Sequence, residues 1–240
     1  MIEIQNLTVR FENKLILEEV SCNIIKGKIT SIIGKSGIGK SVLMKSVLGL
    51  IKNIEGEIYV DNISIMTRDK RENKKVKAKM AMLFQNSALF DSFDVYQNIA
   101  FPLSEHTKMS YSEIKEKVKE MIRLVNLPDI LELYPSDLSG GMRKRVALAR
   151  AIIQEPEYLI YDEPTTGLDP ITAKEIINLI ESIHKKLEMT SIVITHDKDC
   201  IEQLTEQIIM IDNKKIIFSD EFKKFKEFEH PTAREFFGIV

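Results

Sequence analysis

Cysteine, tryptophan and long apolar runs are scarce or absent in this chain of 240 residues, and neither sign of charge dominates. The two cysteines, Cys22 and Cys200, lie far apart and match no metal-binding or redox spacing. We therefore expect two free thiols in a reducing compartment. The 34 Lys and Arg residues nearly balance the 36 Asp and Glu residues, for a net charge of −2. This balance gives no overall bias toward nucleic acid or an anionic membrane.

Targeting and linker segments are missing as well. Residues 1–4 show no basic region followed by an apolar one, and no apolar run reaches transmembrane length, so neither a signal peptide nor a membrane span is expected. We find no internal repeat, low-complexity tract or Pro/Gly-rich linker. With 44% hydrophobic residues, the chain can bury a full core. We expect residues 1–240 to form one continuous, soluble, cytosolic module.

The most informative stretch lies between a β-branched run (29–33) and a run with helical character (42–50). It has the spacing Gly, any four residues, Gly-Lys-Ser, which predicts a phosphate-binding loop between a strand and a helix. Glycines let successive N–H groups point at phosphate oxygens, and the helix dipole favours negative charge. Lys40 would reach the β- and γ-phosphates, and the Ser41 hydroxyl would bind Mg²⁺. The loop consists of Gly34, Lys35, Ser36, Gly37, Ile38, Gly39, Lys40 and Ser41.

Two adjacent carboxylates follow a second apolar strand, residues 158–161. Beside a phosphate loop, Asp162 can hold Mg²⁺, and Glu163 can orient and deprotonate an attacking water. The alternative, two surface acids that begin a turn, is disfavoured because the end of an apolar strand is a costly place for like charges without a cation.

Three single residues keep two interpretations each. Phe11, beside the break at 12–14 between two predicted strands, could stack on a purine ring or plug a hairpin. Gln85, at the end of the short strand 80–84, could reach a metal or a water, or be an ordinary surface amide. His196, after the buried strand 191–195, could donate to a γ-phosphate or be structural.

A second anion site is also predicted where Ser139, Gly140 and Gly141 precede a helical run over 142–153. Taken alone, a simple helix cap is the better interpretation of this turn. Nearby basic residues either strengthen the positive field or form a solvated face; these are Arg143, Lys144, Arg145 and Arg150.

The remaining segments predict further elements. Residues 68–79 are basic but lack aromatic side chains, which favours a solvated face over a nucleic-acid groove. Residues 86–103 carry apolar side chains without a clean period, typical of packing in a helical lobe or of a docking groove. A capping box predicts a helix over 110–125. The expected hairpins and strand pairs cover 2–25, 56–65 and 207–219, and the tail 221–240 is expected to be helical, packed on the core or against a partner.

Together, the motifs resemble one family. The ordered set is Gly34 to Ser41, Gln85, Leu138 to Gly141, Leu159 to Glu163, Thr166 to Asp169 and His196. It is similar to the nucleotide-binding subunit of an ATP-binding cassette (ABC) transporter, with phosphate loop, Q-loop, signature, carboxylate strand, D-loop and switch histidine in the family's order. The resemblance implies an α/β P-loop NTPase fold: a RecA-like core with an antiparallel β subdomain (about 1–85 and 155–220), a helical signature subdomain (86–154) and a tail (221–240).

Within that family the chain most resembles the Mla/Mce-type phospholipid-transport ATPases, the group associated with lipid asymmetry and toluene tolerance. The segments that carry this resemblance are Leu83 to Ser92, Asn98 to Leu103, Glu105 to Thr107 and Leu138 to Ala147. Met142 stands where many other cassettes have Gln. Phe11 stands where the wider family often has Tyr, so a stacking role needs no hydroxyl.

The resemblance implies ATP, Mg²⁺ and a head-to-tail homodimer. Each ATP would lie between the phosphate loop of one copy and Ser139, Gly140 and Gly141 of the other. Ser41, Gln85 and Asp162 would hold Mg²⁺, with Glu163 acting on water, His196 on the γ-phosphate and Asp169 at the nucleotide. The implied partners are an integral-membrane permease at the cytoplasmic face of the inner membrane and an Mce-domain substrate-binding protein, with no nucleic acid.

Two other interpretations remain open. An ATPase for another solute would share every catalytic residue and differ mainly around residues 85–103. A soluble cassette ATPase is the third: DNA-repair members need a coiled-coil insertion and translation factors usually two cassettes, neither of which is present, whereas an iron–sulfur assembly role is harder to exclude.

Overall fold

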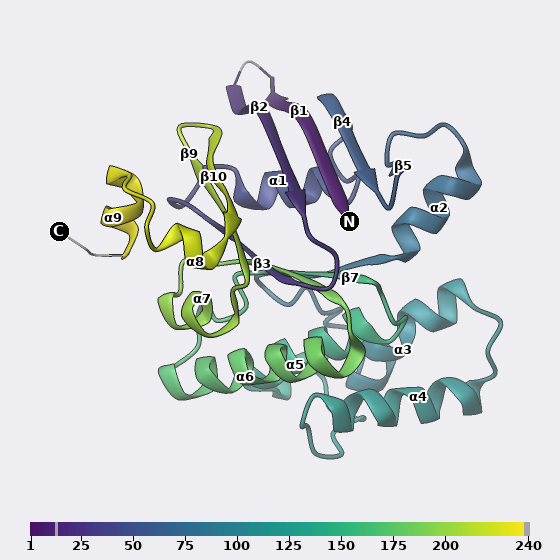
Figure 1. The fold of residues 1–240 in the computed structure, drawn as a ribbon. Coiled ribbons are helices and arrows are strands. Elements are labelled where there is room, and N and C mark those ends of the chain that lie inside the picture. The colour runs from purple at the N-terminus through teal and green to yellow at the C-terminus, as the bar shows by residue number, and fades with distance from the viewer. Residues whose placement is uncertain (13, 238–240) are drawn as a thin grey trace.

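The computed structural model describes residues 1–12 and 14–237 and contains two sheets with helices between and below them (Figure 1). The core sheet has the strand order β10-β9-β3-β8-β7-β6; it is parallel except for β10, which pairs antiparallel with β9. Its strands are β3 (Ile29–Ile33), β6 (Met80–Leu83), β7 (Tyr158–Asp162), β8 (Thr190–Ile194), β9 (Gln207–Asp212) and β10 (Lys215–Glu221).

The central strands β3, β7 and β8 are buried at every residue. Continuous apolar, β-branched runs of this kind form strands that are covered on both faces. Ile32 pairs with Ile194, and Asp162 pairs with the same Ile194 from the other side. The carboxyl ends of these three strands therefore meet at one edge of the sheet, where ligands bind in open α/β folds.

The second sheet is antiparallel, with the order β2-β1-β4-β5. Its strands are β1 (Ile2–Phe11), β2 (Lys14–Ile24), β4 (Ile54–Val60) and β5 (Ile63–Ser64). Helix α1 (Lys40–Val47) lies between the two sheets, and its Leu43, Met44 and Val47 are fully buried in one cluster with apolar residues of both. The helix after the phosphate loop is thus held on two sides.

The opposite face of the core sheet is covered by helices (Figure 1). These are α3 (Val95–His106), α4 (Tyr111–Leu124), α5 (Gly140–Ile152) and α6 (Pro170–Leu187), with the 3-10 turn η1 (Pro135–Asp137) before α5. Ser110 and Glu113 form the predicted capping box of α4, and Asp94 and Gln97 form another at α3. The basic stretch forms α2 (Lys70–Ala78), in which only Val76 is buried, as expected for a solvated face.

The last helices pack against β9 and β10. They are α7 (Lys198–Leu204), α8 (Phe222–Phe225) and α9 (Pro231–Phe237), and Phe218, Phe225 and Phe228 form an aromatic cluster between them. The predicted helical tail is confirmed as far as Phe237; residues 238–240 lie outside the described part. Glu235 of α9 reaches Lys35 of the phosphate loop at 2.9 Å, so the tail ends beside that loop.

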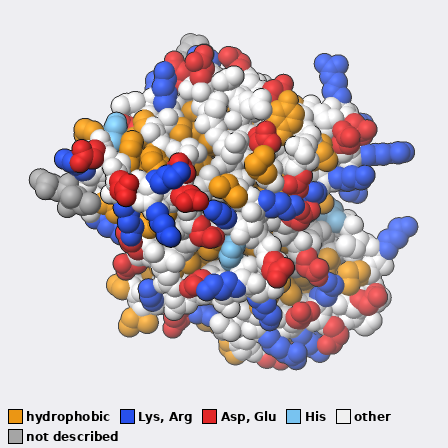
Figure 2. All heavy atoms as spheres, in the orientation of Figure 1, with side chains coloured by type: hydrophobic (Ala, Val, Ile, Leu, Met, Phe, Trp, Pro, Cys, Tyr) orange, Lys and Arg blue, Asp and Glu red, His pale blue; other side chains and the backbone are white. Residues whose placement is uncertain are grey.

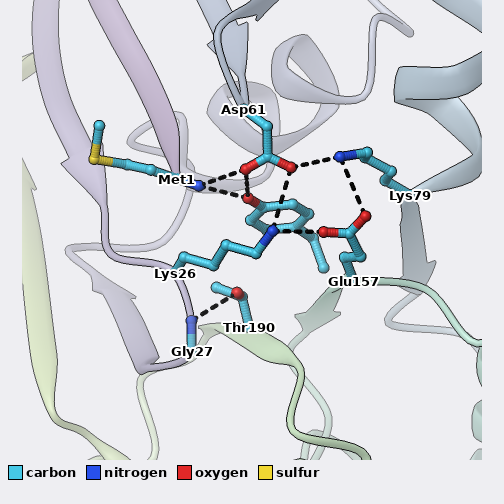
Figure 3. A network of polar contacts seen from close by, with 8 residues as sticks. Met1, Lys26, Gly27, Asp61, Lys79, Glu157 and Thr190 are labelled. Atoms are coloured by element: carbon cyan, nitrogen blue, oxygen red, sulfur yellow. Dashed lines mark hydrogen bonds and ion pairs between the residues drawn. The ribbon is translucent and has the colours of Figure 1, made fainter.

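A network of charges joins the two sheets at the end away from the carboxyl edge (Figure 3). Asp61, in the β4–β5 turn, accepts from Lys79 at 2.7 Å, from Tyr158 at 2.6 Å and from the Met1 amino group at 2.8 Å. Burial alone would raise the pKa of Asp61, but these hydrogen bonds outweigh it and hold that pKa well below its usual range. Glu157 binds Lys26 at 2.6 Å and Lys79 at 3.1 Å.

The predicted elements are confirmed with small changes of boundary. The helix after the phosphate loop runs over 40–47 rather than 42–50, and α4 runs over 111–124 rather than 110–125. β1 and β2 pair antiparallel as expected, although Asn13, in the predicted turn, lies outside the described residues. Along 1–12 and 14–237, no helix is both long and apolar enough to cross a bilayer. Basic and acidic side chains are interspersed on the face shown in Figure 2.

Candidate functional site

The phosphate loop connects β3 to α1, and three of its glycines have positive φ: Gly34 at 147°, Gly37 at 74° and Gly39 at 115°. L side chains rarely adopt such angles. At Gly34 a Cβ would also lie 2.4 Å from the Ile211 carbonyl oxygen of β9. Close packing against the neighbouring strand therefore requires glycine here, while Lys35, Ser36 and Gly37 lie exposed on the outer side of the loop.

Lys40 is buried, with 7% of its surface exposed. Its ammonium donates to the carbonyl oxygens of Gly34 at 2.8 Å and Lys35 at 3.1 Å. Burial lowers its pKa, and the nearby carboxylates of Glu163 and Asp162 partly oppose that effect. A cation is thus held under the arch of the loop, where phosphate oxygens would compete with backbone carbonyls for its protons.

Ser41 and Asp162 meet although 121 residues separate them: the Ser41 hydroxyl donates to Asp162 Oδ1 at 2.8 Å. Asp162 ends β7 and is 5% exposed. Burial raises its pKa, and the hydrogen bond from Ser41 partly offsets this. A buried carboxylate whose ionised form is disfavoured is suited to binding a cation.

Glu163 follows directly, in a left-handed backbone conformation with φ of 49°. Its N–H donates to the Ile194 carbonyl at 2.9 Å. Its carboxylate accepts from Thr166 Oγ1 at 3.1 Å and lies 2.9 Å from His196 Nδ1. Because the carboxylate can only accept, Nδ1 carries the proton of this contact. The structure therefore joins two predicted residues, Glu163 and His196, and adds Thr166, which the sequence placed in the D-loop motif without a role at this site.

Gln85 lies one strand away, after β6, and its side chain is exposed. The backbone carbonyl of Gln85 accepts from the ammonium of Lys144, which also donates to the backbone carbonyl of Glu163 at 3.3 Å. Lys144 is 5% exposed, so it does not belong to the solvated face that the sequence allowed. A signal was present: Gly141, Lys144, Leu148 and Ile152 follow helical spacing and share the buried face of α5.

The signature turn lies at the start of α5. Ser139 is exposed and its Oγ accepts from Met142 N at 3.2 Å, so it caps the helix as the simpler interpretation expected. Gly140 and Gly141 pack toward Leu168 and Thr172 at the start of α6. Among the described residues, no recorded hydrogen bond or ion pair joins this turn to the phosphate loop of the same chain.

Phe11 and Asp169 lie at the margins of the site. Phe11 ends β1 and is 46% exposed. On the paired strand, Leu17 packs against Gly39, which puts this hairpin beside the phosphate loop. Asp169 caps α6, accepting from the N–H groups of Ile171 at 3.1 Å and Thr172 at 3.0 Å; the bond from Thr172 is the main cause of its lowered pKa.

The oxygen ligands available at the carboxyl edge fit Mg²⁺. Ser41 and Asp162 offer oxygen ligands within hydrogen-bond distance of each other, and Mg²⁺ prefers few protein oxygens together with substrate phosphates. Within the described residues, no group of three or more His, Cys, Asp or Glu side chains is placed to hold a metal.

Comparison with known proteins identifies the family. The family described as ABC transporter matches residues 17–166. This chain belongs to the ABC transporter family. Its phosphate loop, Asp162 and Glu163 all fall within the matched range, and the cassette fold expected from the motifs is confirmed. The chain is thus an ATP-binding cassette ATPase.

Individual relatives of this ABC protein carry different transport names. It is 39% identical to the intermembrane phospholipid transport system ATP-binding protein MlaF of Haemophilus influenzae, over 90% of this chain and 82% of that protein. It is 38% identical to the methionine import ATP-binding protein MetN of Carboxydothermus hydrogenoformans, over 100% of this chain and 72% of that protein. The ATP-binding cassette MJ0796, solved as a post-hydrolysis dimer bound to ADP and Pi, matches with a TM-score of 0.81 and 30% identity, covering 92% and 98%.

Proposed function

We propose that this chain hydrolyses ATP to power phospholipid transport through a membrane permease, to which it binds at the cytoplasmic face of the inner membrane. The observation that carries the proposal is the 39% identity to MlaF, a phospholipid-transport ATPase, over 90% of the chain. The segments 83–92, 98–103 and 105–107, which resemble Mla/Mce-type ATPases, also support it, because an ATPase for another solute is expected to differ mainly around residues 85–103.

The nucleotide site requires two copies in this proposal. Ser139 stands exposed at a helix N-terminus, which attracts anions, and the neighbouring Gly141 packs against Thr172 of α6. In a head-to-tail dimer, the exposed turn of one copy meets the ATP held by Lys40 of the other. The similar MJ0796 cassette was solved as a dimer bound to ADP and Pi, which supports pairing of two copies.

The hydrolytic step uses groups at the carboxyl edge. Glu163 orients and deprotonates the water that attacks the γ-phosphate. His196, whose Nδ1 lies 2.9 Å from Glu163, acts on the γ-phosphate in this proposal. Ser41, Asp162 and Gln85 would hold Mg²⁺, which would supply charge neutralisation during phosphoryl transfer. Phe11 stacks on the adenine ring, and Asp169 approaches the nucleotide from the D-loop.

The permease would dock on the aromatic segment after Gln85. Phe90, Phe93 and Phe101 form one cluster with ring centroids 5.0 to 5.9 Å apart, and Phe90 is 43% exposed. Beneath it, the fully buried Asn98 bonds both the N–H and the carbonyl of Phe90. An exposed aromatic cluster on a rigid base is a typical anchor for a partner protein.

A second candidate is a cassette for another solute. It is favoured by the 38% identity to MetN over the full chain, which nearly equals the identity to MlaF. A soluble iron–sulfur assembly ATPase is the remaining alternative.

Purification from native membranes in mild detergent separates these functions. We expect a polytopic permease and an Mce-domain protein to accompany the tagged chain, identified by mass spectrometry. Phe93→Ala tests the docking site, because it removes one ring of the aromatic cluster. It should reduce recovery of the permease without changing ATP hydrolysis by the isolated chain. Recovery of a permease with a solute-binding protein and no Mce-domain protein would replace lipid transport by the second candidate.

A further inference from the structure

Lys144 is a buried cation that the proposed reaction does not use. It lies in the second turn of α5 with 5% of its surface exposed, and an ammonium is costly to bury unless its protons are bonded. Within the described chain it forms no ion pair with a carboxylate. Its protons are instead directed at two backbone carbonyls, those of Gln85 and Glu163.

Those two carbonyls lie where a strand pair separates. β6 and β7 run parallel, with Leu83 opposite Tyr161, so Gln85 and Glu163 are the corresponding residues two positions further. The β6–β7 pairing ends at Leu83, whereas β7 remains bonded to β8 through Glu163 N and the Ile194 carbonyl at 2.9 Å. Where the hydrogen bonds between β6 and β7 end, the Lys144 ammonium connects the two chain segments. Glu163 O accepts in addition from Thr166 N at 3.3 Å.

We propose that Lys144 is a positioning residue for ATP hydrolysis: its ammonium ties Gln85 to Glu163 and holds both against the signature helix. This rests on the proposed roles of Gln85 and Glu163 in the hydrolytic site. Glu163 has a left-handed backbone that costs free energy and persists only when its surroundings hold it. A bond to its carbonyl fixes the direction in which its carboxylate leaves the strand.

The geometry also joins two half-sites within one chain. Lys144 lies on the helix that Ser139 begins, and in the proposed dimer Ser139 serves the partner's ATP. Movement of α5 on engaging that ATP is therefore transmitted through the ammonium to this chain's own Gln85 and Glu163. The positive charge also faces the Asp162 and Glu163 carboxylates, which oppose the lowering of the Lys144 pKa that burial causes.

The test compares Lys144→Met, Lys144→Gln and Lys144→Arg in steady-state hydrolysis. Lys144→Met keeps the length and loses charge and donors; we expect kcat to fall by about tenfold or more, with KM for ATP within about threefold of wild type. Lys144→Arg, which keeps charge and N–H donors, should retain most of kcat. Lys144→Gln keeps a shorter donor and should lie between them, and it carries the test if the Met variant does not fold.

Two controls separate positioning from loss of structure. Arg145→Met removes a cation from the same helix whose bonds go to Glu175 and the Val125 carbonyl, away from both loops; its kcat should stay within about twofold of wild type. In a Glu163→Gln background, Lys144→Met should still form the ATP-bound dimer, because binding is not the step affected.

The inference is overturned if Lys144→Met keeps kcat within about twofold of wild type, or if the loss of kcat is matched by loss of ATP binding and of the dimer. Glu163→Gln is assayed in parallel. If that variant is inactive while Lys144→Met is normal, only the role of Lys144 fails. If Glu163→Gln itself hydrolyses ATP normally, the proposed site fails.

Discussion

Glu163 combines three features that an attacking-water site needs. It lies at the carboxyl edge beside Asp162, its side chain is 13% exposed, and His196 and Thr166 restrict its orientation. The neighbouring Asp162 is buried and bonded to Ser41, so it is directed at the cation position instead of at water. Asp162 is the last residue of β7, whereas Glu163 follows it in a left-handed conformation, so two carboxylates next to each other in sequence have different surroundings.

Glu163→Gln tests the proposed role of Glu163 as the base that acts on water. The amide keeps the size of the side chain and cannot accept a proton from water, so turnover should fall by about a hundredfold or more while ATP binding and dimerisation persist. Single-turnover hydrolysis and equilibrium nucleotide binding measure the two properties separately. Near-normal hydrolysis would remove Glu163 from the role of base.

At the scale of elements, the contact between α5 and α6 shapes the signature turn. A Cβ on Gly141 would lie 2.6 Å from Thr172 Cγ2, whereas one on Gly140 would meet Leu168 Cδ2 at 3.4 Å, an ordinary contact. Thr172 is β-branched and stiff in a helix, so it cannot turn away cheaply. The second glycine of the turn is therefore required by packing within the chain.

The pair Gly140→Ala and Gly141→Ala separates packing from nucleotide contact. Gly141→Ala should lower the free energy of unfolding by about 1–3 kcal/mol, because the new methyl group overpacks the helix contact. Gly140→Ala should leave the thermal midpoint nearly unchanged and weaken only the ATP-dependent dimer. Equal destabilisation by both substitutions, measured by denaturant unfolding, would contradict the geometry.

The charge network around Asp61 predicts a pH dependence of stability. Because the pKa of folded Asp61 is lower than its unfolded value, its contribution is fully present above the unfolded pKa of about 3.9 and is lost as the pH falls toward the folded value. Asp61→Asn should therefore lower the thermal midpoint at pH 7, with the difference from wild type narrowing below about pH 4.

Glu116→Gln is the control for that measurement. Glu116 pairs with Lys119 on an exposed helix face at 2.8 Å, and such pairs contribute little. Its midpoint should match wild type at both pH values. A difference between Asp61→Asn and wild type that stays constant on acidification would show that the network does not act through the charge of Asp61.

The whole molecule presents two halves of a nucleotide site that face different ways. Lys40 is buried under its loop, and Ser139 is exposed at the start of α5, with no recorded bond between the turn and the loop within the described chain. In the proposed head-to-tail dimer, two copies would bring the unlike halves together twice, once at each site.

Mixing two inactive variants tests this arrangement. Lys40→Ala removes the phosphate-binding cation, and Ser139→Arg blocks the signature turn with a bulky side chain, so each variant alone should hydrolyse no ATP. In a mixed dimer both changes fall in one composite site and leave the other intact, and hydrolysis should return. If differently tagged variants are shown to pair and hydrolysis stays absent, the head-to-tail site is wrong.

The sequence by itself determined the features that depend on local spacing. The glycines at 34, 37 and 39, the strand that ends in Asp162 and Glu163, and the cap at Ser139 follow from the conformational preferences of neighbouring residues and were predicted correctly as structure. The tertiary structure decided what residues far apart in the chain do together. Strand order and register placed His196 beside Glu163 and Ser41 beside Asp162.

Lys144 shows the limit most clearly. Three consecutive basic residues begin the second turn of α5, and their composition is that of a solvated face. Helical spacing puts Lys144 on the buried face of α5, but only the packing of α5 against the ends of β6 and β7 supplies the carbonyls on which the free energy of a buried ammonium depends. Those carbonyls belong to residues 59 and 19 positions away, and no local pattern brings them together.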